Sequence, residues 1–254
     1  MSKPLIALGA ILLSMCFAFN SCDTLQQAGM GKFPVSGTAA ADTSVGPPNS
    51  SEISSGIKQA LQVGLQDAVK QVSATDGYFK NPLIKIMFPP NAVKVENTLR
   101  GIGLGSLCDN VELSLNRAAE DAAKQASPIF LNALKQMTLQ DASQILLGPD
   151  TAATSYFKRA TTSELTAKFS PVISQSLSKV DATKYWSQVT TKYNQIPLVK
   201  PVNTDLTAYV TQKAIDGLFT MISQKEVQIR QQLGARTTPL LQKVFGYAAE
   251  KTNK

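Results

Sequence analysis

Histidine is missing from this chain of 254 residues, and cysteine occurs only three times. Histidine is the commonest general base near neutral pH and the commonest side-chain ligand of metal ions. Its absence excludes zinc sites, Ser-His-Asp triads and Cys-His pairs. An enzyme would have to work with carboxylates, lysine, tyrosine or serine alone. The sequence therefore favours a protein that is not an enzyme and that needs no metal or other cofactor.

Long runs of like charge are also missing. The chain carries 25 Lys and Arg against 18 Asp and Glu, a net charge of +7, but the basic residues are scattered singly. Basic arms that bind nucleic acid contain runs of five or six like charges, so we expect no nucleic-acid partner. The mildly basic surface suits anionic lipid or polysaccharide, and it is equally typical of lysines that are simply solvated.

The one long apolar run, "LIALGAILLSMCFAF" at residues 5–19, lies at the N-terminus. It is too short to span a membrane and has the length of a signal-peptide core. Lys3 precedes the run, and the small Ser21 stands directly before Cys22. Bacterial lipoprotein signals have this order, and their cysteine is acylated after cleavage. The sequence predicts a lipoprotein-type signal peptide over residues 1–21 and lipidation at Cys22.

Other processing schemes fit the N-terminus less well. A plain secretory signal would be cleaved near Ser21 without lipidation, and an uncleaved anchor would need a longer apolar run. Cys16 follows the bulky Met15, which does not suit a cleavage site. Stable anchoring takes more than one acyl chain. We expect a protein of the bacterial cell envelope, attached to a membrane through its lipid and facing the periplasm or the exterior.

The rest of the chain divides into a tether and a helical part. Residues 22–50 are rich in Gly, Pro, Ser and Thr and show no periodicity, so they are predicted to form the lipid anchor and a flexible tether. Apolar residues in 51–254 recur at helical spacing, which predicts an all-α fold as a single multi-helix, bundle-like domain. The expected helices cover 51 to about 75, 91–101, 106–125, 128–136, 139–147, 150–160, 162–179, 182–194, 204–233 and 238–251.

Two short apolar segments interrupt this helical pattern. "NPLIKIMFPP" at 81–90 and "IPLVKPV" at 196–202 contain prolines and are too short for helices, so both are expected to be extended. They could pair as one short two-stranded β ribbon, near residues 83–88 and 196–202. Each could equally be a buried loop.

The stretch "LRGIGLGSLCDNVELSLNRAAEDAAKQA" at 99–126 is the densest in chemical groups. Its glycines follow a helix with G-x-G-x-G spacing, which differs from the dinucleotide fingerprint and indicates a helix stop. Cys108 falls on the apolar face of the next predicted helix, where a buried and inert thiol is expected. Two S-x-x-K matches, at Ser55 and Ser176, lack the companion elements of penicillin-recognising enzymes. We assign no catalytic residue.

Glu112, Asn116 and Glu120 lie one turn apart on that same helix, with Arg117 beside them. Two carboxylates on either side of an amide could bind a cation or a polar ligand. The alternative is a solvated stripe of helix-supporting polar pairs. These four residues are our candidate binding surface. A hydrolase that uses these carboxylates would need two acids facing one cleft, at least one of them with a raised pKa.

Four longer strings carry a family resemblance: "LRGIGLGSLCDNVELSLNRAAEDAA", "LKQMTLQDASQILLGPDTAATSYFKRAT", "KYNQIPLV" and "LTAYVTQKAIDGLFTMISQKEVQIRQ". They resemble a family of bacterial exported proteins catalogued only as a domain of unknown function, DUF4197. The resemblance runs from about Ser51 to Gly246. It implies an envelope location and a mostly helical fold, and it implies no activity and no catalytic residues.

Two hypotheses follow for the function. The first is a non-enzymatic binding or assembly module of the envelope, whose partner is lipid, glycan or another envelope protein. The second is a carboxylate-dependent hydrolase of an envelope substrate.

Overall fold

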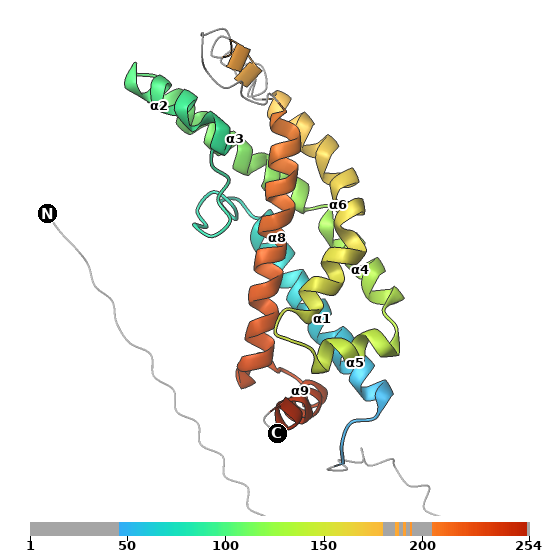
Figure 1. Cartoon of the computed structure of the whole chain (residues 1–254). Coiled ribbons are helices and arrows are strands. Elements are labelled where there is room, and N and C mark those ends of the chain that lie inside the picture. Colours follow the sequence, from blue (N-terminus) through green and yellow to red (C-terminus); the bar gives the residue numbers. More distant parts are fainter. Residues whose placement is uncertain (1–45, 180–185, 188–189, 192–193, 195–204, 253–254) are drawn as a thin grey trace, which may run out of the picture. The chain divides into compact units, whose positions relative to one another are not determined.

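The computed structural model describes residues 46–179, 186–187, 190–191, 194 and 205–252. Residues Gly46–Lys254 form one compact unit. Its helices are α1 (Ser50–Ser73), α2 (Val93–Gly101), α3 (Gly105–Ala123), α4 (Ala126–Gln136), α5 (Leu139–Leu147), α6 (Ala152–Lys179), α8 (Leu206–Gln231) and α9 (Pro239–Thr252), with short 3-10 turns at Pro90–Ala92 and Leu233–Ala235 (Figure 1). The described residues contain no strand, so the all-α prediction is confirmed. None of the described helices is long and apolar enough to cross a membrane.

Capping residues set the starts of two helices. α1 begins after Asn49, whose side chain accepts a hydrogen bond from the Glu52 amide while the Glu52 carboxylate accepts one from the Asn49 amide. The same reciprocal pair between Thr138 and Asp141 opens α5. Each capping box satisfies backbone N–H groups that have no partner inside the helix. This is why α5 begins at Leu139, as the sequence predicts.

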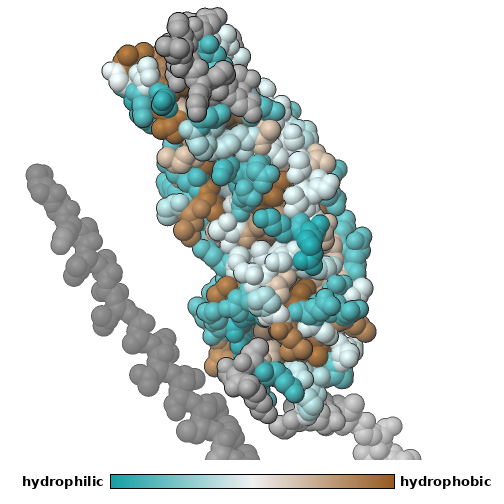
Figure 2. All heavy atoms as spheres, in the orientation of Figure 1, coloured by the Kyte–Doolittle hydropathy of each residue, from teal (hydrophilic) through white to brown (hydrophobic). Residues whose placement is uncertain are grey.

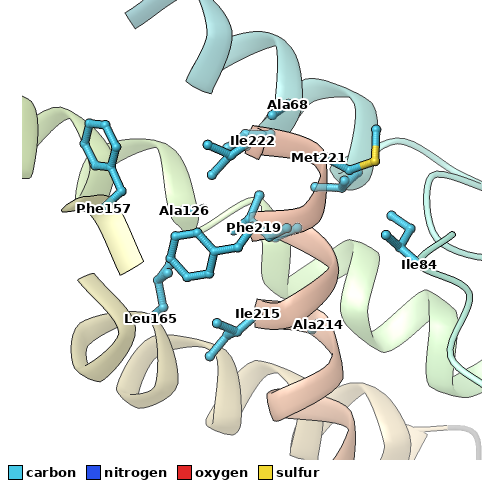
Figure 3. Close-up of a cluster of buried hydrophobic side chains, with 14 of the residues drawn as sticks. Ala68, Ile84, Ala126, Phe157, Leu165, Ala214, Ile215, Phe219, Met221 and Ile222 are labelled. Atoms are coloured by element: carbon cyan, nitrogen blue, oxygen red, sulfur yellow. The ribbon is translucent and has the colours of Figure 1, made fainter. Parts of the chain in front are cut away.

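The core is built around α8, which packs against α6, α1 and α3 (Figure 1). Figure 3 shows Ile215, Phe219 and Ile222 projecting from α8 on the side of Leu165, while Met221 points the other way, toward Ile84. Both sides of α8 are therefore buried over its middle turns. The large apolar residues and the alanine of this part of α8 are all buried: Val210, Ala214, Ile215, Leu218, Phe219, Met221 and Ile222.

α6 is a single helix, where the sequence predicted two, 150–160 and 162–179. Its buried residues recur every four positions: Ala153, Phe157, Thr161, Leu165, Phe169, Ile173 and Leu177. A step of four residues advances about 400° around a helix of 3.6 residues per turn, so the buried side rotates by about 40° per step. Near its start Phe157 contacts Phe130 of α4, and near its end Ser176 donates a hydrogen bond to Asp121 of α3. Because the buried side rotates around α6, its apolar residues do not keep the 3.6-residue period from which one continuous helix is predicted.

One buried ion pair joins three helices. Glu226 of α8 accepts hydrogen bonds from the Ala153 and Thr154 amides at the start of α6. Arg230, one turn further along α8, pairs with Glu226 at 2.9 Å and donates to the Ile145 and Leu146 carbonyls at the end of α5. The carboxylate meets the positive end of one helix dipole and the guanidinium meets the negative end of another.

The predicted β ribbon has no counterpart in the described residues. Residues 82–88 are turn and extended chain without a ladder, and 196–202 lie outside the described residues. The segment still alternates as an extended chain does, because Ile84, Ile86 and Phe88 are buried while Leu83 and Met87 are exposed. Its backbone is paired by side chains of α3 and α8, which takes the place of a neighbouring strand.

Candidate functional site: a buried polar side of α3

Three of the four candidate residues on α3 are buried, whereas the side chain of Arg117 is partly exposed, and all four lie against the chain's own segment 74–89. Glu112, Asn116 and Glu120 are 7%, 0% and 3% exposed, respectively. Their spacing of four residues places them on one side of the helix, as expected. The prediction of a solvated stripe does not fit this burial, since the side chains make their hydrogen bonds inside the protein. The sequence identified the polar side of the helix but not the segment that covers it.

Asn116 pairs with the backbone of Ile86. Its Oδ1 accepts from the Ile86 amide at 2.8 Å, and its Nδ2 donates to the Ile86 carbonyl at 2.8 Å. The same Nδ2 donates to the Glu112 carbonyl, also at 2.8 Å. A buried amide satisfied in this way fixes both the segment and its own rotamer.

Glu120 holds the start of the segment. Its Oε1 accepts from the Tyr78 and Phe79 amides at 3.1 and 3.3 Å, and its Oε2 accepts from Arg117 at 2.6 Å. The Tyr78 side chain then crosses to α8, where its hydroxyl donates to the Ala214 carbonyl at 2.6 Å. Burial, and secondarily the Glu120 charge, raises the pKa of the Tyr78 phenol, which therefore stays neutral.

Asp76 is the acid from outside α3 that converges on this network. It lies in the turn after α1 with φ of +68°, a left-handed conformation that is uncommon for residues other than glycine. Its carboxylate contacts Lys80 at 2.8 Å and Arg117 at 2.7 Å. These two partners lower the pKa of Asp76, with the Lys80 hydrogen bond as the larger cause. From the sequence alone, Asp76 follows the predicted end of the first helix, near residue 75, and has no assigned role.

The charges of the network balance. Glu112 pairs with Lys85 at 2.6 Å, and Lys85 also lies 4.7 Å above the centre of the Phe79 ring, with Arg117 5.9 Å from the same ring. The three acids and three bases are Asp76, Glu112, Glu120, Lys80, Lys85 and Arg117. Each carboxylate has at least one cation as partner. A general acid needs a carboxyl group whose pKa is raised, and the pairing at Asp76 acts in the opposite direction.

A hollow beside this network is open to solvent. It encloses about 340 Å³ and is lined by Gln71, Ala74, Thr75, Asp76, Gly77, Lys80, Asn81 and Pro82. Of the α3 candidates none lines it. In the described part of the chain, no group of three Cys, Asp or Glu side chains is placed to hold a metal ion.

The glycine-rich turn before α3 forms a projecting tip and not a phosphate loop. α2 ends at Gly101, and Gly103 two residues later has a φ of +84°, which agrees with the helix stop that the sequence predicts. Residues 100–104 are all exposed. Cys108 behind the tip is fully buried, and burial raises the pKa of its thiol. An inert thiol agrees with the sequence prediction.

The predicted lipidation site, Cys22, lies outside the described residues. Its modification stays a prediction, as do the signal peptide over 1–21 and the tether over 22–50.

Comparison with known families gives one match. The model of a family described as a protein of unknown function, DUF4197, matches residues 48–246. This agrees with the resemblance carried by the four sequence strings and covers most of the chain. No curated protein and no solved structure matches the chain.

Proposed function

The chain belongs to the DUF4197 family of proteins of unknown function, and on that footing we propose that it is a lipid-anchored protein of the bacterial cell envelope that binds or assembles partners without catalysing a reaction. Its partner would be lipid, glycan or another envelope protein. The lipid on Cys22 would hold it at a membrane, facing the periplasm or the exterior. The apolar leader and the small residue before Cys22 support the anchor.

The observation that favours a non-enzymatic role over a hydrolase is how the polar residues of α3 are used. Asn116 and Glu120 hold the backbone of the segment 74–89, and Glu112 is paired with Lys85. Groups engaged with their own chain are positioned to maintain a shape. A carboxylate hydrolase is the alternative, and it would need one of these acids to leave its cation and act on substrate.

One experiment separates the two. The chain from Cys22 to Lys254 is incubated with envelope lipid extract or with envelope glycan fragments, and both the Tm and the composition of the added material are followed. A binding protein gains about 2.7 kcal/mol of stability when its ligand is at a hundredfold excess over Kd, and its Tm rises by several degrees. We expect such a rise with no new products.

The outcomes are distinct. Release of cleaved lipid or glycan would establish the hydrolase. A Tm that no envelope fraction changes would remove the support for a lipid or glycan partner.

A further inference from the structure

Exposed apolar side chains are concentrated in one segment of the chain. Nine large apolar residues are well exposed among the described residues, and five of them fall between residues 83 and 104. We call them the 83–104 surface: Leu83, Met87, Val93, Ile102 and Leu104. Figure 2 shows hydrophobic side chains over the α2 end of the fold. Single exposed leucines are ordinary on protein surfaces, whereas five exposed apolar side chains within one short segment of the chain indicate an interaction site.

The lower part of this surface is held rigidly outward. Leu83 and Met87 are 65% and 51% exposed because Ile84 and Ile86 between them point into the core. Asn116 fixes the backbone at Ile86, and the Tyr209 hydroxyl donates to the Met87 carbonyl at 3.1 Å. The outward side chains therefore project from a backbone with satisfied hydrogen bonds, and binding costs little ordering entropy.

The upper part is the tip between α2 and α3. Ile102 and Leu104 are 67% and 41% exposed. The Leu104 amide donates to the Leu99 carbonyl, which closes the turn. Arg100 at the base of the tip is paired with both Glu96 and Asp109. The tip thus presents two branched apolar side chains on a closed turn.

Basic side chains accompany the apolar ones. Lys94 is exposed on α2, and Lys80 has a side chain that is 74% exposed although it also contacts Asp76 at 2.8 Å. The whole chain carries a net charge of +7. Apolar side chains flanked by lysines are the composition that inserts into the headgroup region of anionic membranes.

The anchor would keep this surface within reach of a bilayer. The 23 residues from 23 to 45 separate Cys22 from the compact unit. A fully extended chain of that length spans at most about 80 Å, at about 3.5 Å per residue. α2 lies at the far end of the fold from the start of α1 (Figure 1). Even so, 80 Å allows the surface to turn toward the membrane that holds the lipid.

We propose that the 83–104 surface docks on anionic lipid headgroups, with Ile102, Leu104 and Met87 entering the interface and the neighbouring lysines meeting the lipid phosphates. The proposal deepens the proposed function by naming its partner, and it rests on the envelope anchoring. The lipid on Cys22 would hold the protein at the membrane, and the 83–104 surface would add a second contact that orients the fold against the headgroups.

The test uses the chain from Cys22 to Lys254 with Cys22→Ser, made without its leader so that it carries no acyl group. Flotation with vesicles of equal parts phosphatidylcholine and phosphatidylglycerol is compared with flotation with phosphatidylcholine alone. We expect binding to the anionic vesicles that weakens as salt is raised. The Ile102→Ser/Leu104→Ser variant is expected to lower the partition constant roughly tenfold, because less apolar area is removed from water.

The matched control is Leu139→Ser/Leu147→Ser, because these leucines of α5 are 56% and 52% exposed and lie outside the 83–104 surface. It should bind as the parent does. Lys94→Gln should weaken binding to the anionic vesicles by about fivefold and leave binding to neutral vesicles unchanged. Circular dichroism confirms that each variant keeps its helix content.

Two results would overturn the proposal: no flotation with anionic vesicles, or equal losses in the tip variant and the α5 control. Failure of the anchor is a separate matter. If residue 22 proves unmodified in the native host, the unacylated chain can still float with vesicles. If residue 22 is acylated but the unacylated chain does not bind vesicles, the anchoring stands and the proposal for the 83–104 surface fails.

Discussion

Asn116 and Ile86 exchange two hydrogen bonds of 2.8 Å, one in each direction, between a side-chain amide on a helix and a backbone amide in an extended segment. Neighbouring residues in an antiparallel sheet pair in the same way. The side-chain amide of Asn116 therefore makes the two hydrogen bonds that a neighbouring strand would make to Ile86. This relationship explains why a polar residue stands at a fully buried position of α3.

Asn116→Ala should be strongly destabilising. It leaves the Ile86 amide and carbonyl buried without partners, and each such group costs about 1–3 kcal/mol. We expect a loss of about 3 kcal/mol in the free energy of unfolding by urea. Asn110→Ala, on the exposed side of the same helix, is the control and should change stability by less than about 0.5 kcal/mol. Equal effects of the two variants would contradict the role of Asn116 in pairing the Ile86 backbone.

Two glycines in helix interiors should respond in opposite directions to alanine. A Cβ on Gly217 of α8 would lie 2.7 Å from the Tyr78 ring and 3.1 Å from Ile84 Cβ, whereas nothing lies within 4 Å of a Cβ on Gly246 of α9. Gly217→Ala should cost about 1–3 kcal/mol by overpacking. Gly246→Ala should stabilise by about 0.5–1 kcal/mol through helix propensity. Thermal unfolding of the two variants measures both changes in stability. If Gly217→Ala leaves the Tm unchanged, Tyr78 and Ile84 pack less closely on α8 than the structure shows.

Glu226→Ala should be among the most damaging single changes. It leaves the nearly buried Arg230 without its carboxylate and removes the acceptor at the start of α6. Breaking one partner of such a pair costs about 3–5 kcal/mol. The control is Lys124→Ala, because the Lys124–Asp121 pair is exposed and contributes about 0–1 kcal/mol. If chemical denaturation gives the two variants equal losses of stability, the Glu226–Arg230 pair does not link α5 to α6 as described.

The Asp76 network predicts a pH dependence. Lys80 and Arg117 hold the pKa of Asp76 below its value in the unfolded chain. The resulting stabilisation is present above the unfolded pKa of about 3.9 and is lost as the pH falls through the lower folded pKa. Asp76→Asn keeps the shape and tolerates the left-handed backbone, but it cannot ionise. The stability difference between parent and variant should therefore be largest near neutral pH and shrink below about pH 4. A difference that stays constant from neutral to acidic pH would show that the charge of Asp76 does not contribute.

Much of the helical fold could be predicted from the sequence, because capping pairs and apolar spacing act locally. Thr138 and Asp141 fixed the start of α5 in this way. The sequence predicts two helices where α6 is one, because its buried residues recur every four positions and no single apolar face persists along it. Its partners change from α4 to α3 along its length, and that change is a tertiary feature.

The sequence predicts which residues of α3 form the candidate site, but it does not predict what they bind. Helical spacing was sufficient to place Glu112, Asn116 and Glu120 on one side of a helix. Their partners, Lys85, Ile86 and Tyr78, stand 27 to 42 positions earlier in an irregular segment. No local period connects the two, and only the fold brings them together. The prolines and alternating isoleucines of that segment did indicate an extended chain, which is what it is.

The most direct test of the proposed role is the mass of the N-terminal peptide from protein purified from its native host. The account predicts a chain that begins at residue 22 and carries the mass of two or three acyl chains on that cysteine. An unmodified residue 22, whether the leader is intact or removed, would contradict the anchor on which the envelope function rests.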